Sequence, residues 1–353
     1  MQTDSALNHP LIHFCLSLAY LFVFLTTTIG NFLILYVFVS QKRVRSVPNF
    51  FLANLTVADL CVGIFCVLQN AVHFVFQGHG RWPFGRALCY SYIYTLHLVP
   101  NVSAGILVLV SIERLIAVVK PLRVRRAFSY RVLVSCSAFV WISSAIMNLP
   151  YFFASQYREF SDENETLSIC TRRHIEIGGV NVLKLVATIN FIVWYAIPLL
   201  ILLFIYATIG IVVTRAAQMS KQSDDKLLPR SSWRSETSSM AVDKSKKVGR
   251  LAVGIVVAFA VFSLPRYAYV MWTVWRDPMV PRCLDCLQSL LQPISFLLLF
   301  FNSAVDPFLY AFLSTRFRQS IKETFGLVKT RENTVELSSR HQKRAHTTDL
   351  MTQ

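Results

Sequence analysis

The sequence predicts an all-α membrane protein, a bundle of seven transmembrane helices, and two observations lead to this fold class. Hydrophobic residues make up 54% of the 353 residues and charged residues only 15%, whereas soluble proteins average about 45–50% and about 25%. In addition, seven stretches contain the roughly 20 apolar residues that a helix needs to cross a bilayer core of about 30 Å. The expected spans are about 14–39, 50–76, 87–119, 132–153, 183–213, 248–275 and 287–312.

The seven spans differ in how clearly the sequence marks them. Spans one, four and five carry almost no charge in their central parts, and the others contain isolated charged residues. Prolines inside several spans are compatible with helices, because neighbouring helices can bond to the carbonyl groups that proline leaves free. The apolar runs are continuous instead of alternating, which excludes an outer-membrane β-barrel.

Lysine and arginine are concentrated in one set of connections, which predicts the orientation of the chain. The connections 41–45, 120–131 and 214–250 and the tail 316–353 hold 25 basic and 8 acidic residues, and the opposite connections hold 8 of each. By the positive-inside rule the first set is cytoplasmic, so we expect the amino terminus outside and the carboxy terminus inside. This cytoplasmic face carries the excess of basic residues that gives the chain its net charge of +16. The expected partner of these basic residues is membrane lipid, so their number does not indicate binding to nucleic acid.

The segments outside the spans have separate expected roles. Residues 1–10 lack a basic start and the first apolar run is of spanning length, so no cleavable signal peptide is expected. The expected organisation is an extracellular amino terminus at 1–13, the bundle at 14–313, a third intracellular loop at 214–247 and a disordered cytoplasmic tail at 327–353.

A short amphipathic helix is expected at 314–326, lying on the inner leaflet after span seven. Its apolar side would turn Phe317 and Ile321 toward lipid. The basic residues expected to face phosphate groups are Arg316, Arg318 and Lys322.

Several residues on the outer side can be modified or cross-linked. Asn164 begins an Asn-Glu-Thr glycosylation acceptor. Cys89 and Cys170 face an oxidising compartment and could bridge. Cys283 and Cys286 lie together in the third outer loop, where a local bridge and a second pairing are both open.

Charged residues inside spans are expensive, so each is a candidate for function. Asp59 and Asp306, with Ser103, Asn302 and Ser303, could form a polar cluster in spans two, three and seven. Such hard oxygen ligands suit a sodium ion, or a proton and water. The alternative is a structural network that holds water and no ion; no other metal is expected.

The motifs in the spans, taken together, resemble those of the rhodopsin-like (class A) G-protein-coupled receptors, of the neuropeptide-receptor type. The resemblance covers about 14–326, and Cys89 stands 25 residues before Arg114, which is the family's spacing. The matching pieces are Gly30-Asn31, Asn54-Leu55-Thr56-Val57-Ala58-Asp59-Leu60, Trp82-Pro83-Phe84-Gly85, Ser111-Ile112-Glu113-Arg114-Leu115, Trp141, Pro198, Tyr206, Phe259 through Pro265, and Asn302-Ser303-Ala304-Val305-Asp306-Pro307-Phe308-Leu309-Tyr310.

The resemblance implies a plasma-membrane receptor that activates a heterotrimeric G protein. Arg114 would be restrained at rest and then released to meet the G protein, while span six moves outward about Pro265. Hydroxyl-rich segments of the third inner loop and the tail would be phosphorylated by receptor kinases and bind arrestin. The residues assigned to activation and coupling are Glu113, Arg114, Pro121, Leu122, Tyr206, Phe259, Pro265, Pro307 and Tyr310.

The chain also departs from the family pattern. Ser263 stands where the family often has tryptophan, and Leu115 where the arginine motif has an aromatic residue. Ala104 replaces a bulkier aliphatic residue, and Ser245 stands where an acidic residue would lock Arg114. We therefore expect measurable signalling without ligand.

The expected ligand is an extracellular peptide. An amine receptor would carry a carboxylate at Leu96, and an opsin a lysine near Phe296, so both types are disfavoured. Arg266 follows Pro265 and could hold a carboxylate or a carbonyl of the ligand, or instead pair within the outer loops. The expected ligand-binding residues are Gln69, Asn70, His73, His97, Asn101, Asn190, Trp194, Arg266, Tyr267, Tyr269, Gln288 and Gln292.

Other classes of function stay open at this point. A class A receptor for a small molecule or lipid shares the same motifs. A seven-span transporter could use Asp59, Glu113 and Asp306, but the sequence contains no repeated halves. An enzyme is not expected, because no Ser/His/Asp set converges and the histidines lack metal-ligand spacing.

Overall fold

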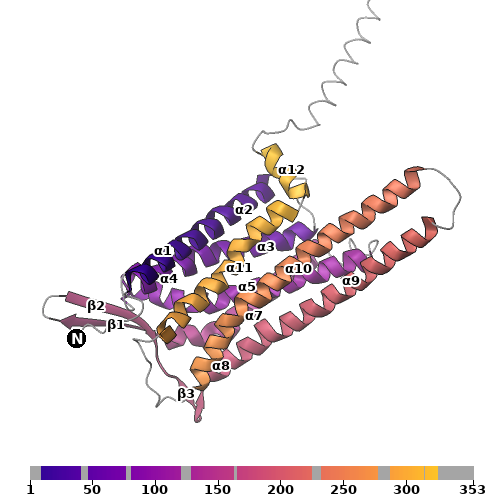
Figure 1. The fold of residues 1–353 in the computed structure, drawn as a ribbon. Helices are drawn as coiled ribbons and strands as arrows, with labels where there is room; N and C mark the ends of the chain where they lie inside the picture. Colours follow the sequence, from indigo (N-terminus) through magenta and orange to yellow (C-terminus); the bar gives the residue numbers. More distant parts are fainter. Residues whose placement is uncertain are drawn as a thin grey trace, which may run out of the picture.

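The computed structural model describes residues 9–40, 47–76, 81–120, 129–162, 165–224, 232–276, 287–313 and 315–324. Within these ranges, seven helical segments are long and apolar enough to cross a membrane. They lie side by side as one elongated bundle (Figure 1), so the predicted seven-span fold is confirmed.

Spans one and two are helices interrupted by π-helical turns. Span one consists of α1 (Pro10–Leu25), η2 (Thr26–Gly30) and α2 (Asn31–Ser40). Span two consists of α3 (Val47–Cys61), η4 (Val62–Val67), α4 (Leu68–Ala71) and η5 (Val72–Phe76).

The remaining spans are longer and include the prolines noted in the sequence. Span three is α5 (Gly85–Val119) and span four is α7 (Tyr130–Ala154). Span five consists of α8 (Val182–Phe191), η7 (Ile192–Ala196) and α9 (Ile197–Asp224), and span six is α10 (Ser232–Trp275). Span seven consists of η8 (Leu287–Leu290) and α11 (Leu291–Leu313), and α12 (Thr315–Thr324) follows it.

The helix α5 is central to the bundle. It contacts α3, α7, α9 and α10, while α11 packs against α10 and returns to α1 and η2, which closes the ring of spans. Buried apolar residues such as Val102 and Ile106 of α5 form the core, and large residues such as Phe139 and Phe204 are exposed on the outer faces. Such apolar outer faces suit a lipid environment.

The second outer loop contains strands that the sequence analysis did not predict. Strand β1 (Ser155–Asp162) pairs antiparallel with β2 (Glu165–Arg172), with Tyr157 opposite Cys170. Cys170 is bonded to Cys89 at the outer end of α5, which confirms that predicted disulfide. The bond fastens the hairpin to the end of the bundle opposite α12 (Figure 1).

A smaller hairpin follows, formed by β3 (Glu176–Ile177) and β4 (Val180–Asn181). Gly178 and Gly179 form its two-residue turn with φ of 59° and 78°. A turn with two positive φ values matches the twist of a hairpin and favours glycine at both positions.

Three expected boundaries differ from the structure. Helix α1 begins at Pro10, within the segment expected to be an extracellular terminus. The expected loop at 214–247 is helical in its described parts, since α9 runs to Asp224 and α10 begins at Ser232.

The amphipathic helix is present as α12, but Ile321 does not simply face lipid. It packs against the hydrophobic core of the bundle, because α12 lies against α2 and α11, whose inner ends offer it an apolar surface. Arg318 and Lys322 are exposed as expected. The side chains of Arg316 and Phe317, the tail at 327–353, Pro121, Leu122, Asn164, Cys283 and Cys286 lie outside the described residues.

Candidate functional site

The outer half of the bundle contains a pocket lined by residues of spans three to seven. Five of the predicted ligand residues line it: His97, Asn101, Asn190, Arg266 and Tyr267. The other lining residues, which the sequence analysis did not select, are Leu96, Pro100, Tyr151, Ala187, Val270 and Leu299. The pocket therefore combines an apolar wall with a few polar groups, as small-molecule and peptide sites commonly do.

Arg266 is the buried cation of this pocket, with only 6% of its surface exposed. Its guanidinium carbon lies 3.6 Å from the ring centroid of Phe296 and 5.9 Å from that of Tyr269. No carboxylate among the described residues forms an ion pair with it. A buried charge of this kind favours an anionic or carbonyl group in the pocket.

A chain of hydrogen bonds joins four spans along the pocket wall. The hydroxyl of Tyr267 donates to Asn101 Oδ1 at 3.2 Å, and Asn101 Nδ2 donates to Asn190 Oδ1 at 3.2 Å. Asn190 Nδ2 donates to Asn148 Oδ1 at 2.9 Å, and Asn148 donates to the carbonyl of Ser144 at 2.8 Å. The chain thus connects spans six, three, five and four. Asn148 was not among the predicted residues, and its signal in the sequence was an amide side chain within a predicted span.

His97 and Tyr151 form a second polar feature of the wall. Their rings stack with centroids 3.7 Å apart. Nδ1 of His97 lies 2.9 Å from the carbonyl oxygen of Ile93 and must therefore donate. In the neutral ring Nε2 is then an acceptor, and it is buried with no hydrogen-bond partner among the described residues, so it is available to an N–H or O–H of a ligand. The signal for Tyr151 was an aromatic residue directly after Pro150 at the outer end of span four.

The other predicted ligand residues with described side chains lie outside this pocket. The side chain of Asn70 accepts a hydrogen bond from the hydroxyl of Tyr20 and donates one to the hydroxyl of Tyr92, each at 2.7 Å. Both ends of its amide are therefore hydrogen-bonded within the protein. Trp194 packs against α5, where a Cβ on Gly105 would be 3.0 Å from its ring. The remaining cases are Gln69, which is buried, His73, which packs edge-on against Trp82, and Tyr269, which donates to Gln292. The side chain of Gln288 lies outside the described residues.

The predicted polar cluster is assembled deeper in the bundle. Asp59, Ser303 and Asp306 are all buried, and Asp59 lies within interaction range of the other two side chains. Oδ2 of Asp59 and Oγ of Ser103 are buried without hydrogen-bond partners among the described residues. Carboxylate, hydroxyl and amide oxygens fit a hard monovalent cation, and no cluster of His, Cys, Asp and Glu in the described ranges fits another metal.

The inner end of span three holds the predicted coupling residues. Glu113 is buried, and its Oε2 lies 3.5 Å from Nε of the partly exposed Arg114. One turn earlier, Ser111 Oγ lies 2.9 Å from the hydroxyl of Tyr206 in span five. Phe259 of span six is buried between spans three and five. The side chains of Ser245 and Tyr310 lie outside the described residues.

The arrangement of these features agrees with a match to one protein family. The family described as 7 transmembrane receptor (rhodopsin family) matches residues 30–310. The chain belongs to this family. The family consists of receptors and not enzymes, so this receptor catalyses no reaction, and the transporter alternative loses its support.

Similar proteins include receptors for several neuropeptides. The receptor is 28% identical to galanin receptor 2a of Danio rerio over 313 residues, which covers 88% of this chain and 78% of that one. It is 26% identical to the substance-K receptor of Bos taurus over 342 residues, covering 94% and 83%. The trissin receptor of Drosophila melanogaster is 33% identical over 201 residues, which is 56% of this chain and only 29% of that protein. The predicted resemblance to neuropeptide receptors is therefore confirmed over most of the chain.

Proposed function

We propose that the receptor binds an extracellular neuropeptide in the outer pocket and activates a heterotrimeric G protein through an outward movement of span six. The observation that carries the proposal is the placement of Arg266 and Tyr267. Both residues line the pocket and both belong to α10. A ligand that contacts them therefore acts directly on the span expected to move.

The polar groups of the pocket suit a peptide. Arg266 donates several N–H groups and complements a carboxylate or backbone carbonyls. His97 Nε2 supplies an acceptor for a backbone N–H, and the amides of Asn101 and Asn190 both donate and accept. The names of the similar receptors refer to peptide ligands, which supports the same class of ligand here.

The hydrogen-bonded chain from Tyr267 to Asn148 gives a physical route from ligand to span six. A ligand that replaces the hydrogen bonds of Tyr267 or Asn101 would bind the receptor with span six in its outward position better than the receptor at rest. This difference in affinity would shift the population toward the outward position. Pro265, one residue before Arg266, lacks a backbone donor and weakens the helix at that point. Phe259 lies two turns further inward, and the movement would change its packing against spans three and five.

At the inner end, the shift would free Arg114 for the G protein. Arg114 lies 3.5 Å from the carboxylate of its neighbour Glu113 in α5, and this ion pair would restrain it at rest. Tyr206, bonded to Ser111, lies one turn away and would support the open form.

The remaining expectations form part of the same proposal. The receptor would lie in the plasma membrane with its amino terminus outside, carry a glycan at Asn164, and place Arg318 and Lys322 of α12 against lipid phosphates. Receptor kinases and arrestin would act on the inner segments. Asp59, Ser103, Asn302, Ser303 and Asp306 would hold a sodium ion, whose charge would offset the two buried carboxylates.

The test is a screen of neuropeptides for stimulated nucleotide exchange on a G protein, using membranes that contain the receptor. With an active peptide in hand, Arg266→Ala should reduce its binding about 10- to 100-fold, because hydrogen bonds to a charged group contribute about 1.5–3 kcal/mol. Arg131, exposed at the start of α7, provides the matched control: Arg131→Ala should bind the peptide normally. Unchanged affinity in Arg266→Ala would refute the pocket assignment, and exchange that no peptide raises would refute the peptide ligand.

A further inference from the structure

Two arginines approach the outer pocket from different parts of the chain. Arg266 of α10 lines the pocket and is buried. Arg172 ends strand β2, and its guanidinium carbon lies 6.0 Å from the ring centroid of Tyr151, which also lines the pocket. The two guanidinium groups lie within electrostatic range of each other and of His97. Two positive charges therefore meet at one wall of the pocket.

The backbone around Arg172 holds this residue in place. Cys170, two residues earlier, is bonded to the outer end of α5. Arg172 pairs with Ser155 in the hairpin, and the N–H of Arg173 donates to the carbonyl of Ala154 at 2.7 Å. The side chain of Arg172 is exposed, so it can bind a group that enters the pocket from outside.

Neither arginine has a negatively charged partner within the described ranges. No carboxylate there forms an ion pair with Arg172 or Arg266. Glu159 of the same hairpin accepts a hydrogen bond from the hydroxyl of Tyr157 at 2.7 Å. Two like charges that converge in a partly buried place repel each other, and an anion bound between them offsets that repulsion. The two arginines therefore favour an anionic group over a neutral carbonyl.

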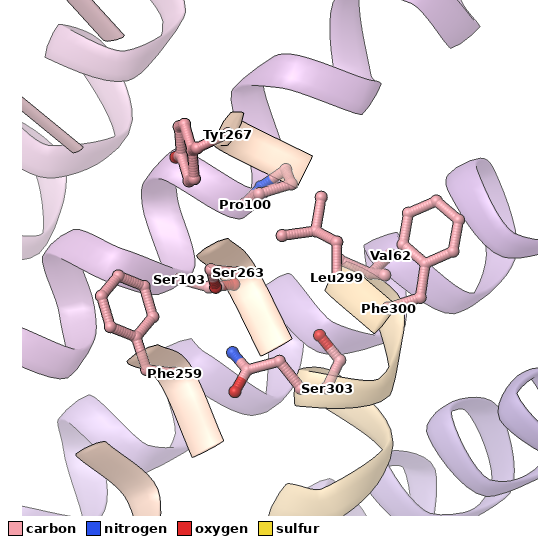
Figure 2. A pocket seen from close by; sticks show the side chains of 10 residues that line it. Val62, Pro100, Ser103, Phe259, Ser263, Tyr267, Leu299, Phe300 and Ser303 are labelled. Carbon is pink, nitrogen blue, oxygen red and sulfur yellow. The ribbon is translucent and has the colours of Figure 1, made fainter. Parts of the chain in front are cut away.

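The pocket is small and closed beneath. Its free space is about 40 Å³, and one water needs about 10–15 Å³, so the pocket admits a group of a few atoms such as a carboxylate. Pro100, Tyr267 and Leu299 form its floor, since they also line a smaller space of about 10 Å³ beneath it, which Figure 2 shows. A peptide therefore places a chain end or one short side chain beside Arg266.

His97 adds a second requirement. Its Nε2 is a buried acceptor without a partner among the described residues, and its ring stacks on Tyr151. In the last residue of a peptide, only one carbon separates the amide nitrogen from the carboxylate. Such a residue can present its carboxylate to the arginines and its N–H to His97, whereas an acidic side chain places the two groups farther apart.

We propose that the outer pocket recognises a carboxylate of the peptide, bound between Arg266 and Arg172, and that a free C-terminal carboxylate fits better than an acidic side chain. The inference rests on the proposed function, since it takes this pocket as the ligand site. Arg266 belongs to the span expected to move and Arg172 to the disulfide-linked hairpin, so the bound carboxylate joins these two parts. A peptide with an amidated C-terminus lacks the charge and binds more weakly.

The test uses two small probes, N-acetyl-L-alanine and its neutral counterpart N-acetyl-L-alaninamide, which differ only in the terminal carboxylate. Their binding to the purified full-length receptor is measured by saturation-transfer NMR, with no peptide and no G protein present. The carboxylate should bind saturably and at least about tenfold more tightly than the amide, because charge-assisted hydrogen bonds are the stronger ones. Equal binding of the two probes, or no saturable binding of either, overturns the proposal.

Variants separate the two arginines from positive charge nearby. Arg266→Gln and Arg172→Gln should each weaken binding of N-acetyl-L-alanine about tenfold. Arg173→Gln is the matched control and should bind the probe normally, because Arg173 adjoins Arg172 but its Nε donates to the carbonyl of Phe153 at 3.1 Å. If Arg266→Gln does not fold, as judged by its thermal midpoint, the exposed Arg172 still decides. Equal affinity in Arg172→Gln and Arg173→Gln overturns the proposal.

A third probe identifies the source of the carboxylate. N-acetyl-L-aspartic acid α-amide carries its carboxylate only in the side chain. Weaker binding of this probe than of N-acetyl-L-alanine supports a free C-terminus, and equal or tighter binding overturns that preference in favour of an acidic side chain. His97→Phe keeps the stacked ring and removes Nε2, so it should weaken binding of N-acetyl-L-alanine several-fold. Because these measurements need neither a peptide nor a G protein, failure of the peptide screen would leave their result intact.

Discussion

Asn101 of span three holds two hydrogen bonds that lead to different helices. It accepts from Tyr267 of span six and donates to Asn190 of span five. In an apolar interior such amides are satisfied only while the helices keep their relative positions, because an unpaired buried amide is costly. Tyr267 also lines the outer pocket, so one side chain links ligand contact and the position of span six.

At the residue scale, Tyr267→Phe should raise signalling in the absence of ligand. The variant keeps the ring and removes the hydroxyl that ties span six to span three. One such bond contributes about 0.5–1.5 kcal/mol, so the active population should rise about 2- to 10-fold, measured as basal nucleotide exchange at equal surface expression. Tyr94→Phe is the control, since the Tyr94 hydroxyl donates to the carbonyl of Ala145 and joins spans three and four only. Equal basal exchange in both variants would contradict a role for the bond in restraining span six.

Glycines allow close contacts between spans one, two and seven. A Cβ on Gly30 would lie 2.7 Å from Cγ of Pro307, so span one touches the proline of span seven directly. The next residue, Asn31, donates to the carbonyl of Ser303 at 3.1 Å. The paired motifs Gly30-Asn31 and Asp306-Pro307 therefore lock the first and last spans together, beside the cluster that contains Asp59. At Gly63 the same kind of contact brings span two against Thr28 of span one.

At the element scale, Gly30→Ala should lower the thermal midpoint of the purified receptor. The added methyl group would meet a rigid proline ring, and overpacking of this kind costs about 1–3 kcal/mol. Gly210 of α9 is the matched control, because nothing lies within 4 Å of a Cβ built there. Gly210→Ala should leave the midpoint unchanged or slightly higher, as alanine favours the helix. A Gly30→Ala variant as stable as the unaltered receptor would show that spans one and seven can separate at little cost.

The whole molecule has the polarity expected of a protein surrounded by lipid. Asp59, Asn101 and Asp306 are buried, while large apolar residues such as Phe139 and Phe204 are exposed on the outside of the bundle. The disulfide-linked hairpin lies at one end and α12 at the other (Figure 1). The end with α12 also carries the exposed basic residues Arg318 and Lys322, and the positive-inside rule predicts that this end faces the cytoplasm.

At the scale of the molecule, epitope tags at the two termini should report opposite sides of the plasma membrane. A tag at the amino terminus should bind antibody on intact cells, and a tag at the carboxy terminus only after permeabilisation. Asn164→Gln should reduce the apparent mass by one glycan, because that asparagine lies in the second outer loop. Both tags on one side would contradict the seven-span topology itself.

The amino-acid sequence was sufficient to count the spans and to reveal the rhodopsin-like motifs, and it indicated that Cys89 and Cys170 could bridge, which the structure confirmed. Apolar runs of spanning length can satisfy their backbone only as helices in lipid, so hydropathy suffices to count them. The same reasoning predicted the burial of Asp59 and Asp306, because charged residues within spans face the interior of a bundle.

Which polar residues meet in one pocket depends on how the helices pack against one another. Asn70 and Asn101 look equivalent in the sequence, yet Asn70 is occupied by Tyr20 and Tyr92 while Asn101 lines the pocket. The rotation of each helix about its axis is fixed by packing against its neighbours, to which glycines such as Gly30 contribute, and local sequence does not encode it. For the same reason the place of Tyr151 in the pocket wall and the hydrogen bond of Asn148 to Asn190 became visible only when residues from several spans were placed together.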